Sequence, residues 1–105
     1  MLCGPCQDEA PQLQALYQQH QAEGFIVITL LGENVYGQPP SQSDLQMWAS
    51  SFGLQHPVLA DPGWAAGDRF ERDGYIPTIS LLQPGAKVLL TDSGYATSQV
   101  PMALP

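Results

Sequence analysis

The first third of the chain has the pattern of an amphipathic helix followed by a strand. Along residues 8–23 the apolar side chains recur at helical spacing, and glutamines supply most of the polar face. This spacing predicts a helix, and Gly24 predicts its end, because glycine readily adopts the left-handed conformation found there. Residues 25–31 are a continuous run of apolar and β-branched residues. Such a run predicts a strand that is buried on both faces.

The remaining pattern predicts a second long helix and a β-hairpin. Glycines and prolines crowd residues 32–40, which we expect to form a loop. Ser41 or Ser43 can cap the following helix, and Gly53 can end it. Beyond it the sequence predicts an extended piece at 56–60, a turn at 61–63, a short helix at 64–72, and strands at 78–82 and 86–90 joined by a turn at 83–85. Helix and strand alternate before the hairpin, so we expect an α/β fold with parallel pairing in its first half.

Composition and charge narrow the classes of function. The chain has 105 residues, 44% of them hydrophobic, which suits a single domain spanning residues 1–105. Three Lys and Arg residues stand against ten Asp and Glu residues, giving a net charge of −7. So acidic a chain lacks the positive surface that a phosphate backbone requires, and we exclude nucleic acid as its main partner. The longest apolar run is too short to span a bilayer, and no signal peptide is visible.

The candidate chemistry lies in Cys3-Gly4-Pro5-Cys6, which contains both cysteines of the chain. A disulfide scaffold would use more cysteines, spaced to join distant segments, so this pair indicates redox chemistry. Cys3 stands where the first helix should begin, and the N–H groups and dipole at such sites lower a thiol pKa to roughly 3.5–7.5. Pro5 suits the first turn, because its fixed φ is helical and its missing N–H is not needed there. We expect Cys3 to be the nucleophile, and Cys6, one turn inside the helix, to resolve the mixed disulfide.

A zinc site is the alternative interpretation of this cysteine spacing. The second half of such a site is missing, because His20 and His56, the two histidines of the chain, are not spaced like a zinc-finger pair. We therefore expect no metal and no cofactor. Both histidines are predicted to lie at the surface or in loops without a chemical role. Trp48 and Trp64 are predicted to be core or lid residues.

The first helix also carries a family resemblance. The segment Cys3-Gly4-Pro5-Cys6-Gln7-Asp8-Glu9-Ala10-Pro11 resembles the active-site segment of thioredoxin-fold proteins. It is most similar to the TlpA/ResA-like (redoxin) bacterial thiol–disulfide oxidoreductases, whose motif reads C-x-P-C-x-x-E-x-P. Before the hairpin, Tyr75-Ile76-Pro77-Thr78 resembles the cis-proline segment of the same family. The resemblance leaves only the tail, residues 91–105, unassigned.

This resemblance implies roles for residues beyond the cysteines. It implies that Glu9 tunes the cysteine pair or relays its protons, whereas the plain alternative is a first-turn carboxylate that favours the helix dipole. It implies a cis Ile76–Pro77 bond that leaves the Ile76 backbone free to bind a substrate strand. The alternative there is a trans proline that merely starts a strand. Gly4 and Pro5 complete the implied substrate-binding surface.

The implied fold is a three-layer α/β/α thioredoxin-like domain, from which the sequence departs at its start. Family members place a central strand immediately before the first cysteine, whereas only Met1 and Leu2 precede Cys3. We therefore expect a domain truncated at the N-terminus and incomplete at both ends, with two half-sheets on either side of a gap. Three outcomes fit this expectation: a fragment of a longer protein, direct closure of the half-sheets, or a homo-oligomer in which a second copy fills the gap.

The leading functional prediction is a thiol–disulfide oxidoreductase that reduces protein disulfides and is itself reduced by an upstream thiol donor. The resemblance implies an extracytoplasmic protein, periplasmic or tethered to a membrane. One alternative is a peroxiredoxin-like peroxidase, which would need a threonine three residues before its reactive cysteine. Cys6 has Cys3 at that position, and Cys3 has no residue so far upstream. The other alternative is a redox-inactive binding domain that presents the groove near Ile76 to a partner.

Overall fold

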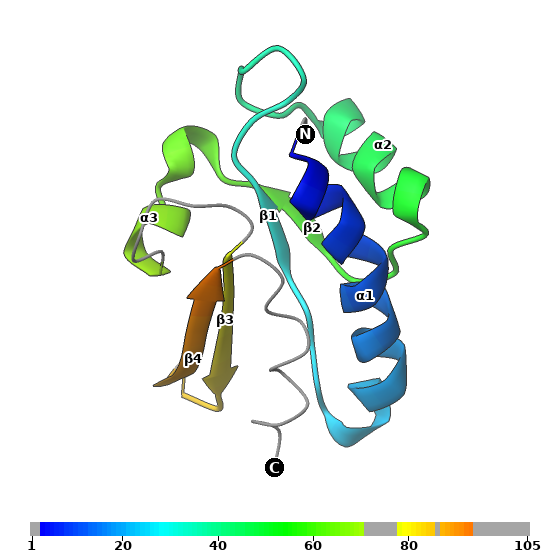
Figure 1. The fold of residues 1–105 in the computed structure, drawn as a ribbon, viewed down its shortest axis with the longest axis vertical. Helices are drawn as coiled ribbons and strands as arrows, with labels where there is room; N and C mark the ends of the chain where they lie inside the picture. Colours follow the sequence, from blue (N-terminus) through cyan, green and yellow to red (C-terminus); the bar gives the residue numbers. More distant parts are fainter. Residues whose placement is uncertain (1–2, 71–77, 86, 94–105) are drawn as a thin grey trace.

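A computed structural model gives the fold for residues 3–70, 78–85 and 87–93. Its elements follow in the order α1 (Gly4–His20), the 3₁₀-helix η1 (Gln21–Glu23), β1 (Thr29–Leu31), α2 (Gln42–Phe52), β2 (Val58–Ala60), the 3₁₀-helix η2 (Pro62–Trp64), α3 (Gly67–Phe70), β3 (Thr78–Gln83) and β4 (Lys87–Ser93). Figure 1 shows α1 and α2 on one side of β1 and β2, with α3 on the other side. The predicted α/β order of helix, strand, helix and hairpin is confirmed.

The first helix begins and ends close to its predicted limits. α1 starts at Gly4, continues through Pro11 and ends at His20. The chain then tightens into η1, which Gly24 ends with a φ of 87°. That angle is in the left-handed region, where a residue with a Cβ atom meets steric resistance. The helix end predicted at Gly24 is therefore confirmed.

The strands form two separate two-stranded sheets in the described part of the chain. β1 pairs in parallel with β2, with Thr29 opposite Val58 and Leu31 opposite Ala60. β3 and β4 pair antiparallel around a turn in which Gly85 has a φ of 91°. Both the parallel pair and the hairpin were predicted. Among the described residues no strand lies between β1 and β3, as the expected half-sheets require.

A capping box starts α2. The Ser41 side chain accepts a hydrogen bond from the Asp44 N–H at 3.2 Å, and the Asp44 carboxylate accepts one from the Ser41 N–H at 2.8 Å. That backbone N–H, followed by the Asn34 amide, lowers the pKa of Asp44. Gly53 ends the helix with a φ of 62°. Of the two serines predicted as candidate caps, the structure therefore selects Ser41 over Ser43.

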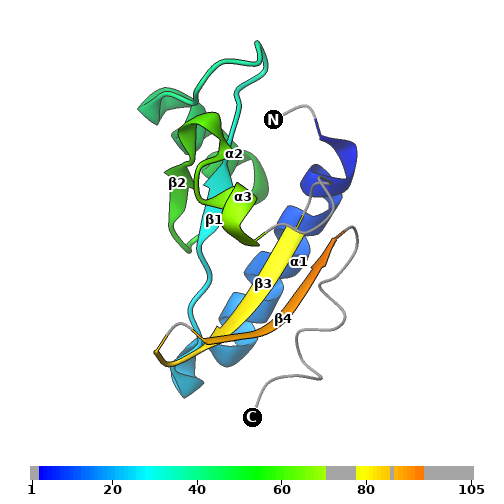
Figure 2. The same ribbon diagram turned by 90° about the vertical axis from the view of Figure 1, so that its left-hand side faces the viewer.

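One helix packs against both sheets. Ala10 of α1 belongs to a buried cluster with Leu31 of β1 and with Leu45 and Trp48 of α2. Further along α1, Leu16 packs with Leu81 of β3 in a second buried cluster. Figure 2 shows β3 drawn along α1. Fully burying an aliphatic side chain of this size contributes about 1.5–3 kcal/mol, so α1 joins the two sheets through its packing.

The strand predicted over residues 25–31 is shorter and more exposed than expected. Only Thr29–Leu31 pair as β1. Burial alternates along the run, because Val27 is only 8% exposed whereas Ile26 and Ile28 are 72% and 53% exposed. The prediction of burial on both faces is wrong. The buried cluster formed with α1 and α2 covers one face of β1, whereas Leu30, on the opposite face, is 40% exposed.

His56 lies in the loop before β2, as one of the two predicted alternatives had it, but its side chain is buried and only 4% exposed. Its Nδ1 lies 3.1 Å from Gln14 Oε1, which also accepts a hydrogen bond from the Gln55 N–H at 2.8 Å. An amide oxygen can only accept, so Nδ1 donates and the neutral ring accepts at Nε2 from the Thr29 hydroxyl, 2.9 Å away. Burial lowers the pKa of His56. The periodicity of the sequence carries no signal for such long-range partners.

Trp48, His20 and the predicted helix at 64–72 remain to be compared with the structure. Trp48 is a core residue, 4% exposed, as expected. His20 lies near the surface, where its Nδ1 is 2.9 Å from Glu23 Oε2. The helix predicted at 64–72 is split into η2 and α3, and residues 71–72 lie outside the described part. None of the helices in the described residues is long and apolar enough to cross a bilayer.

Candidate active site

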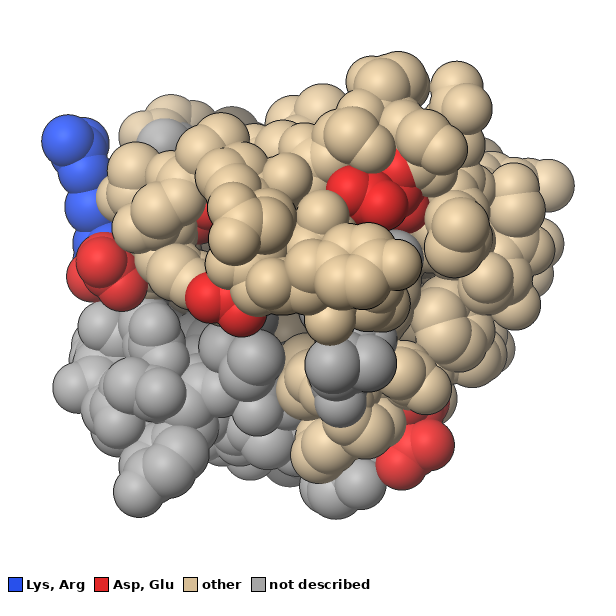
Figure 3. All heavy atoms as spheres, turned by 90° about the horizontal axis from the view of Figure 1, so that it is seen from above, with Lys and Arg blue, Asp and Glu red and all other residues tan. Residues whose placement is uncertain are grey.

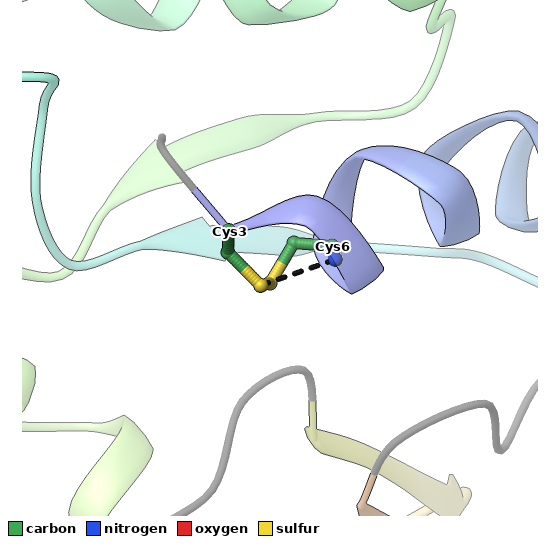
Figure 4. Close-up of a disulfide and its surroundings, with 2 residues drawn as sticks. All are labelled: Cys3 and Cys6. Atoms are coloured by element: carbon green, nitrogen blue, oxygen red, sulfur yellow. Dashed lines mark hydrogen bonds between the residues drawn. A yellow bond between two sulfur atoms is a disulfide. The ribbon is translucent and has the colours of Figure 1, made fainter.

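Cys3 is the N-cap of α1. Its backbone is extended, with φ −78° and ψ 109°, and the helix begins at the next residue. The Cys3 sulfur accepts a hydrogen bond from the Cys6 N–H at 3.1 Å, and the Cys3 carbonyl accepts one from the Gln7 N–H at 3.0 Å. Figure 4 shows the first of these bonds as a dashed line. A sulfur in this position satisfies one of the backbone donors that the first turn of a helix leaves unpaired.

The two cysteines are joined as a disulfide across this first turn. Their Cα atoms are 5.1 Å apart, within the usual range for such a bond. Gly4 and Pro5, which lie between them, are exposed, and both cysteines are partly buried. Cys6 also packs against the buried cluster that contains Ala10 and Leu31. The inner sulfur is therefore held by the core, while the outer part of the turn faces solvent.

The start of α1 combines backbone N–H groups with a first turn free of acidic side chains. The first turn of α1 contains no acidic side chain, so no carboxylate opposes a negative charge on Cys3 there. Figure 3 views the molecule from above, and Lys and Arg colour appears only at the edge of this face, whereas Asp and Glu are scattered over it. The N–H groups and the dipole at the start of α1 favour a negative charge on the Cys3 sulfur.

Glu9 lies in the second turn of α1 and is 2% exposed. The plain interpretation of this residue, a first-turn carboxylate that favours the helix dipole, is therefore wrong, because the helix starts at Gly4 and its first turn contains no acidic residue. Glu9 is three residues after Cys6, and residues at this spacing share a helix face. Position and burial are compatible with the predicted influence on the cysteine pair.

The remaining predicted site residues are Gly4, Pro5, Ile76 and Pro77. Ile76 and Pro77 lie outside the described residues, so the predicted cis bond and the strand-binding backbone stay predictions. Gly4 and Pro5 are found at the exposed turn between the cysteines. No group of three or more potential metal-binding side chains lies together in the described residues.

The sequence did not predict the conformation of Trp64. Trp64 has a φ of 59°, in the left-handed region. Its ring lies where a Cβ atom on Gly32 would be. The Asp61-Pro62-Gly63 turn was predicted, but the ring position of the following tryptophan was not, because the ring lies against Gly32 in a distant segment.

Comparison with known proteins supports the resemblance seen in the sequence. The AhpC/TSA family profile matches residues 1–88. A candidate thiol:disulfide interchange protein DsbE from Chlorobium tepidum superimposes with a TM-score of 0.78 at 20% identity, over 96% of this chain and 69% of that one. A candidate protein disulfide isomerase from Bacteroides thetaiotaomicron gives a TM-score of 0.76 at 20% identity, over 98% of this chain and 67% of that one.

No curated protein matches the chain. The likeness to solved structures shows the fold, which is thioredoxin-like, and the prediction of a thioredoxin-fold redox family is confirmed. The family profile covers more than half of the chain and includes both cysteines. The chain therefore belongs to the AhpC/TSA family.

Proposed function

We propose that this protein is a thiol–disulfide oxidoreductase that reduces disulfides of other proteins through Cys3 and Cys6. The observation that carries the proposal is the disulfide between an N-cap cysteine and a cysteine one turn further along the same helix. A thiolate is the form that attacks a disulfide, and a helix start favours it. A bond that closes so small a loop contributes little to chain entropy, which favours a chemical use over a structural one.

The reaction has two exchange steps. In the reduced protein the Cys3 thiolate attacks one sulfur of the substrate disulfide, forming a mixed disulfide and releasing the other substrate sulfur as a thiolate. The Cys6 thiolate then attacks the Cys3 sulfur, which restores the Cys3–Cys6 bond and releases the second substrate thiol. The substrate gains two electrons and the protein loses two. A dithiol donor returns them by the same exchange in reverse.

Glu9 is the residue we assign to proton handling in this cycle. Each step produces or consumes a thiolate, so a nearby carboxyl that can hold a proton would assist exchange at Cys6. The burial of Glu9 and its spacing from Cys6 support this role. By family resemblance, Gly4, Pro5, Ile76 and Pro77 form the surface on which the substrate strand binds.

The partners and location follow from the same resemblance. We propose protein disulfides as substrates, an upstream thiol protein as electron donor, and an extracytoplasmic location. The names of the two structural neighbours, which refer to thiol:disulfide interchange and to disulfide isomerisation, are compatible with these partners.

Reduction of insulin with dithiothreitol as donor tests the proposed function. We expect the wild-type protein to accelerate precipitation of the insulin B chain and Cys3→Ser to leave only the uncatalysed rate. Cys6→Ser retains the nucleophile, so it should accumulate a mixed disulfide that mass spectrometry can detect. Equal rates for wild type and Cys3→Ser would remove Cys3 from its assigned role.

The two alternative functions stay predictions with their own tests. A peroxiredoxin-like peroxidase would consume hydrogen peroxide in the presence of a thiol donor, and this reaction is measured directly. A redox-inactive binding domain would keep an intact Cys3–Cys6 bond that does not equilibrate with a glutathione redox buffer. The pairing of both cysteines within one helical turn favours dithiol exchange over either alternative.

A further inference from the structure

Trp64 has a backbone conformation that tryptophan rarely adopts. Its φ is 59°, and Gly63 before it has a φ of 67°, so two successive residues are left-handed. For a residue with a side chain this conformation costs about 1–2 kcal/mol, and it persists only where the surroundings enforce it. Such outliers cluster at functional sites.

Hydrogen bonds of Asp61 hold the turn that contains Trp64. It is 5% exposed, and its carboxylate accepts hydrogen bonds from the N–H groups of Ala66 at 2.8 Å and Gly67 at 2.7 Å. The Asp61 carbonyl accepts a bond from the Trp64 N–H at 3.0 Å. The Asp61 N–H donates to the Leu31 carbonyl at 2.8 Å, which fixes the whole turn to the end of β1.

The indole ring of Trp64 lies directly against Gly32. An added Cβ atom at Gly32 would overlap the ring, so this close approach depends on glycine. Gly32 is buried, whereas Trp64 keeps part of its surface in solvent. A left-handed tryptophan and a glycine from a distant segment are thus both required to hold one indole in one place.

The segment that carries Gly32 is connected to the disulfide through the buried core. Gly32 follows Leu31, and Leu31 belongs to the buried cluster against which Cys6 packs. In Figure 4 the two sulfur atoms project from the helix start toward the side on which the pale green ribbon of α3 and the yellow ribbon of β3 are drawn. The turn that carries Trp64 leads directly into α3. In open α/β sheets, ligands bind beyond the carboxyl ends of the strands, where Gly32 follows β1.

We propose that Trp64 is a specificity-determining residue: its exposed indole surface contacts an apolar side chain beside the reacting cysteine of a polypeptide substrate. This inference rests on the proposed function. Tryptophan provides a large, rigid apolar surface at low cost in side-chain entropy, which is why it is enriched at sites of protein recognition. A small disulfide without flanking residues would not reach this surface.

Trp64→Gly is the primary test, because glycine removes the indole and also relieves the left-handed backbone. The substrates are 2-hydroxyethyl disulfide, a peptide disulfide with glycine on both sides of cysteine, and one with leucine there. We expect Trp64→Gly to lower kcat/KM for the leucine peptide about tenfold, mainly through KM, which corresponds to one lost apolar contact. Rates with the other two substrates should stay within about twofold. Trp64→Phe should keep most of the preference.

Gly32→Ala is the second variant, because it displaces the indole without removing it. Gly32→Ala should show the same selective fall in kcat/KM for the leucine peptide. The double variant Gly32→Ala/Trp64→Gly should show no larger fall than Trp64→Gly alone. Circular dichroism and thermal unfolding verify that each variant is folded.

An equal fall in kcat/KM of Trp64→Gly for all three disulfides would overturn the inference, because Trp64 would then act only on the structure of the site. An unchanged preference for leucine in Trp64→Gly would overturn it as well. The proposed function fails in a different way: the wild type would reduce none of the three disulfides faster than Cys3→Ser, and the inference would fall with it.

Discussion

Single residues at the start of α1 set the chemistry that we propose. Cys3 caps the helix with its sulfur, and Cys6 donates its N–H to that sulfur. Gly4 and Pro5 form the exposed turn between them, and Pro5 has no backbone N–H that the first turn would leave unpaired. Glu9 adds a buried carboxyl one turn beyond Cys6.

Glu9→Gln separates a chemical role of this carboxyl from a structural one. Glutamine keeps the shape and loses the titrating proton, so we expect kcat/KM for insulin reduction to fall roughly a hundredfold, the lower end of general acid–base contributions. The pH dependence of the rate should lose one ionisation. A variant with the wild-type pH profile would show that Glu9 only packs.

For single residues, the sequence predicted the features that depend on neighbours close in the chain. The cysteine spacing, Pro5 and the position of Glu9 were readable because helix starts have strong short-range signals. The burial of Glu9 and the ring position of Trp64 were not, because each depends on segments far away in the chain. Gly32, which accommodates the Trp64 ring, looked like any other loop glycine.

Whole elements are tied together by a buried polar network. Gln14 of α1, Thr29 of β1 and His56 before β2 share hydrogen bonds. These contacts hold the first helix to the parallel sheet independently of the apolar clusters. Because an unsatisfied buried polar group costs free energy, the network also fixes how the elements align.

This network makes stability depend on pH. Burial lowers the pKa of His56 from its ordinary value of 6.5, so the unfolded chain takes up a proton more readily than the folded one. The stability contributed by the buried neutral His56 is complete above the pKa that this residue has in the unfolded chain. It is lost as the pH falls from that value toward the pKa in the folded chain. We therefore expect the free energy of unfolding in urea to fall between about pH 7.5 and pH 5.

His56→Gln should remove this part of the pH dependence and lower stability by about 1–3 kcal/mol at neutral pH. His20→Gln is the matched control, because His20 lies near the surface and should change neither quantity beyond about 0.5 kcal/mol. Equal pH profiles for wild type and His56→Gln would show that the ring is not the titrating group.

The limits of elements were predictable wherever a cap or turn residue marks them. Gly24, Gly53 and the hairpin turn lie where expected because left-handed glycines are chosen locally. The length of β1 was not predictable. Residues 25–31 are apolar apart from Thr29, but only the part opposite β2 has a partner strand. Strand pairing, and not composition, therefore sets the bounds of β1.

In the described part of the chain, α1 joins two small sheets. The outer face of β1 and β2 presents apolar side chains to solvent, including Ile28 at 53%, Leu30 at 40% and Leu59 at 48% exposure. An isolated two-stranded sheet is only marginally stable, and open sheet edges invite pairing with another copy. A homo-oligomer, one of the three outcomes that fit the sequence, stays a prediction that these features support.

Sedimentation velocity over a range of concentrations tests this association. We expect the wild-type chain to form dimers or larger species, and Leu30→Lys to weaken them by roughly tenfold or more, because an unpaired charge would be buried. Met47→Lys, on an exposed position of α2, is the matched control and should leave association unchanged. A monomeric wild type at every concentration, with a high melting temperature, would contradict this prediction.

Ionisation of the Cys3 sulfur by the helix start is the step on which all of the proposed chemistry depends. The pH dependence of iodoacetamide alkylation in Cys6→Ser, where Cys3 is the sole thiol, measures it most directly. We predict an apparent pKa for Cys3 clearly below about 8.5, the value of a free thiol. The thiol left in Cys3→Ser should react more slowly at neutral pH. A Cys3 that ionises at or above the free-thiol value would contradict the assignment of this residue as the nucleophile.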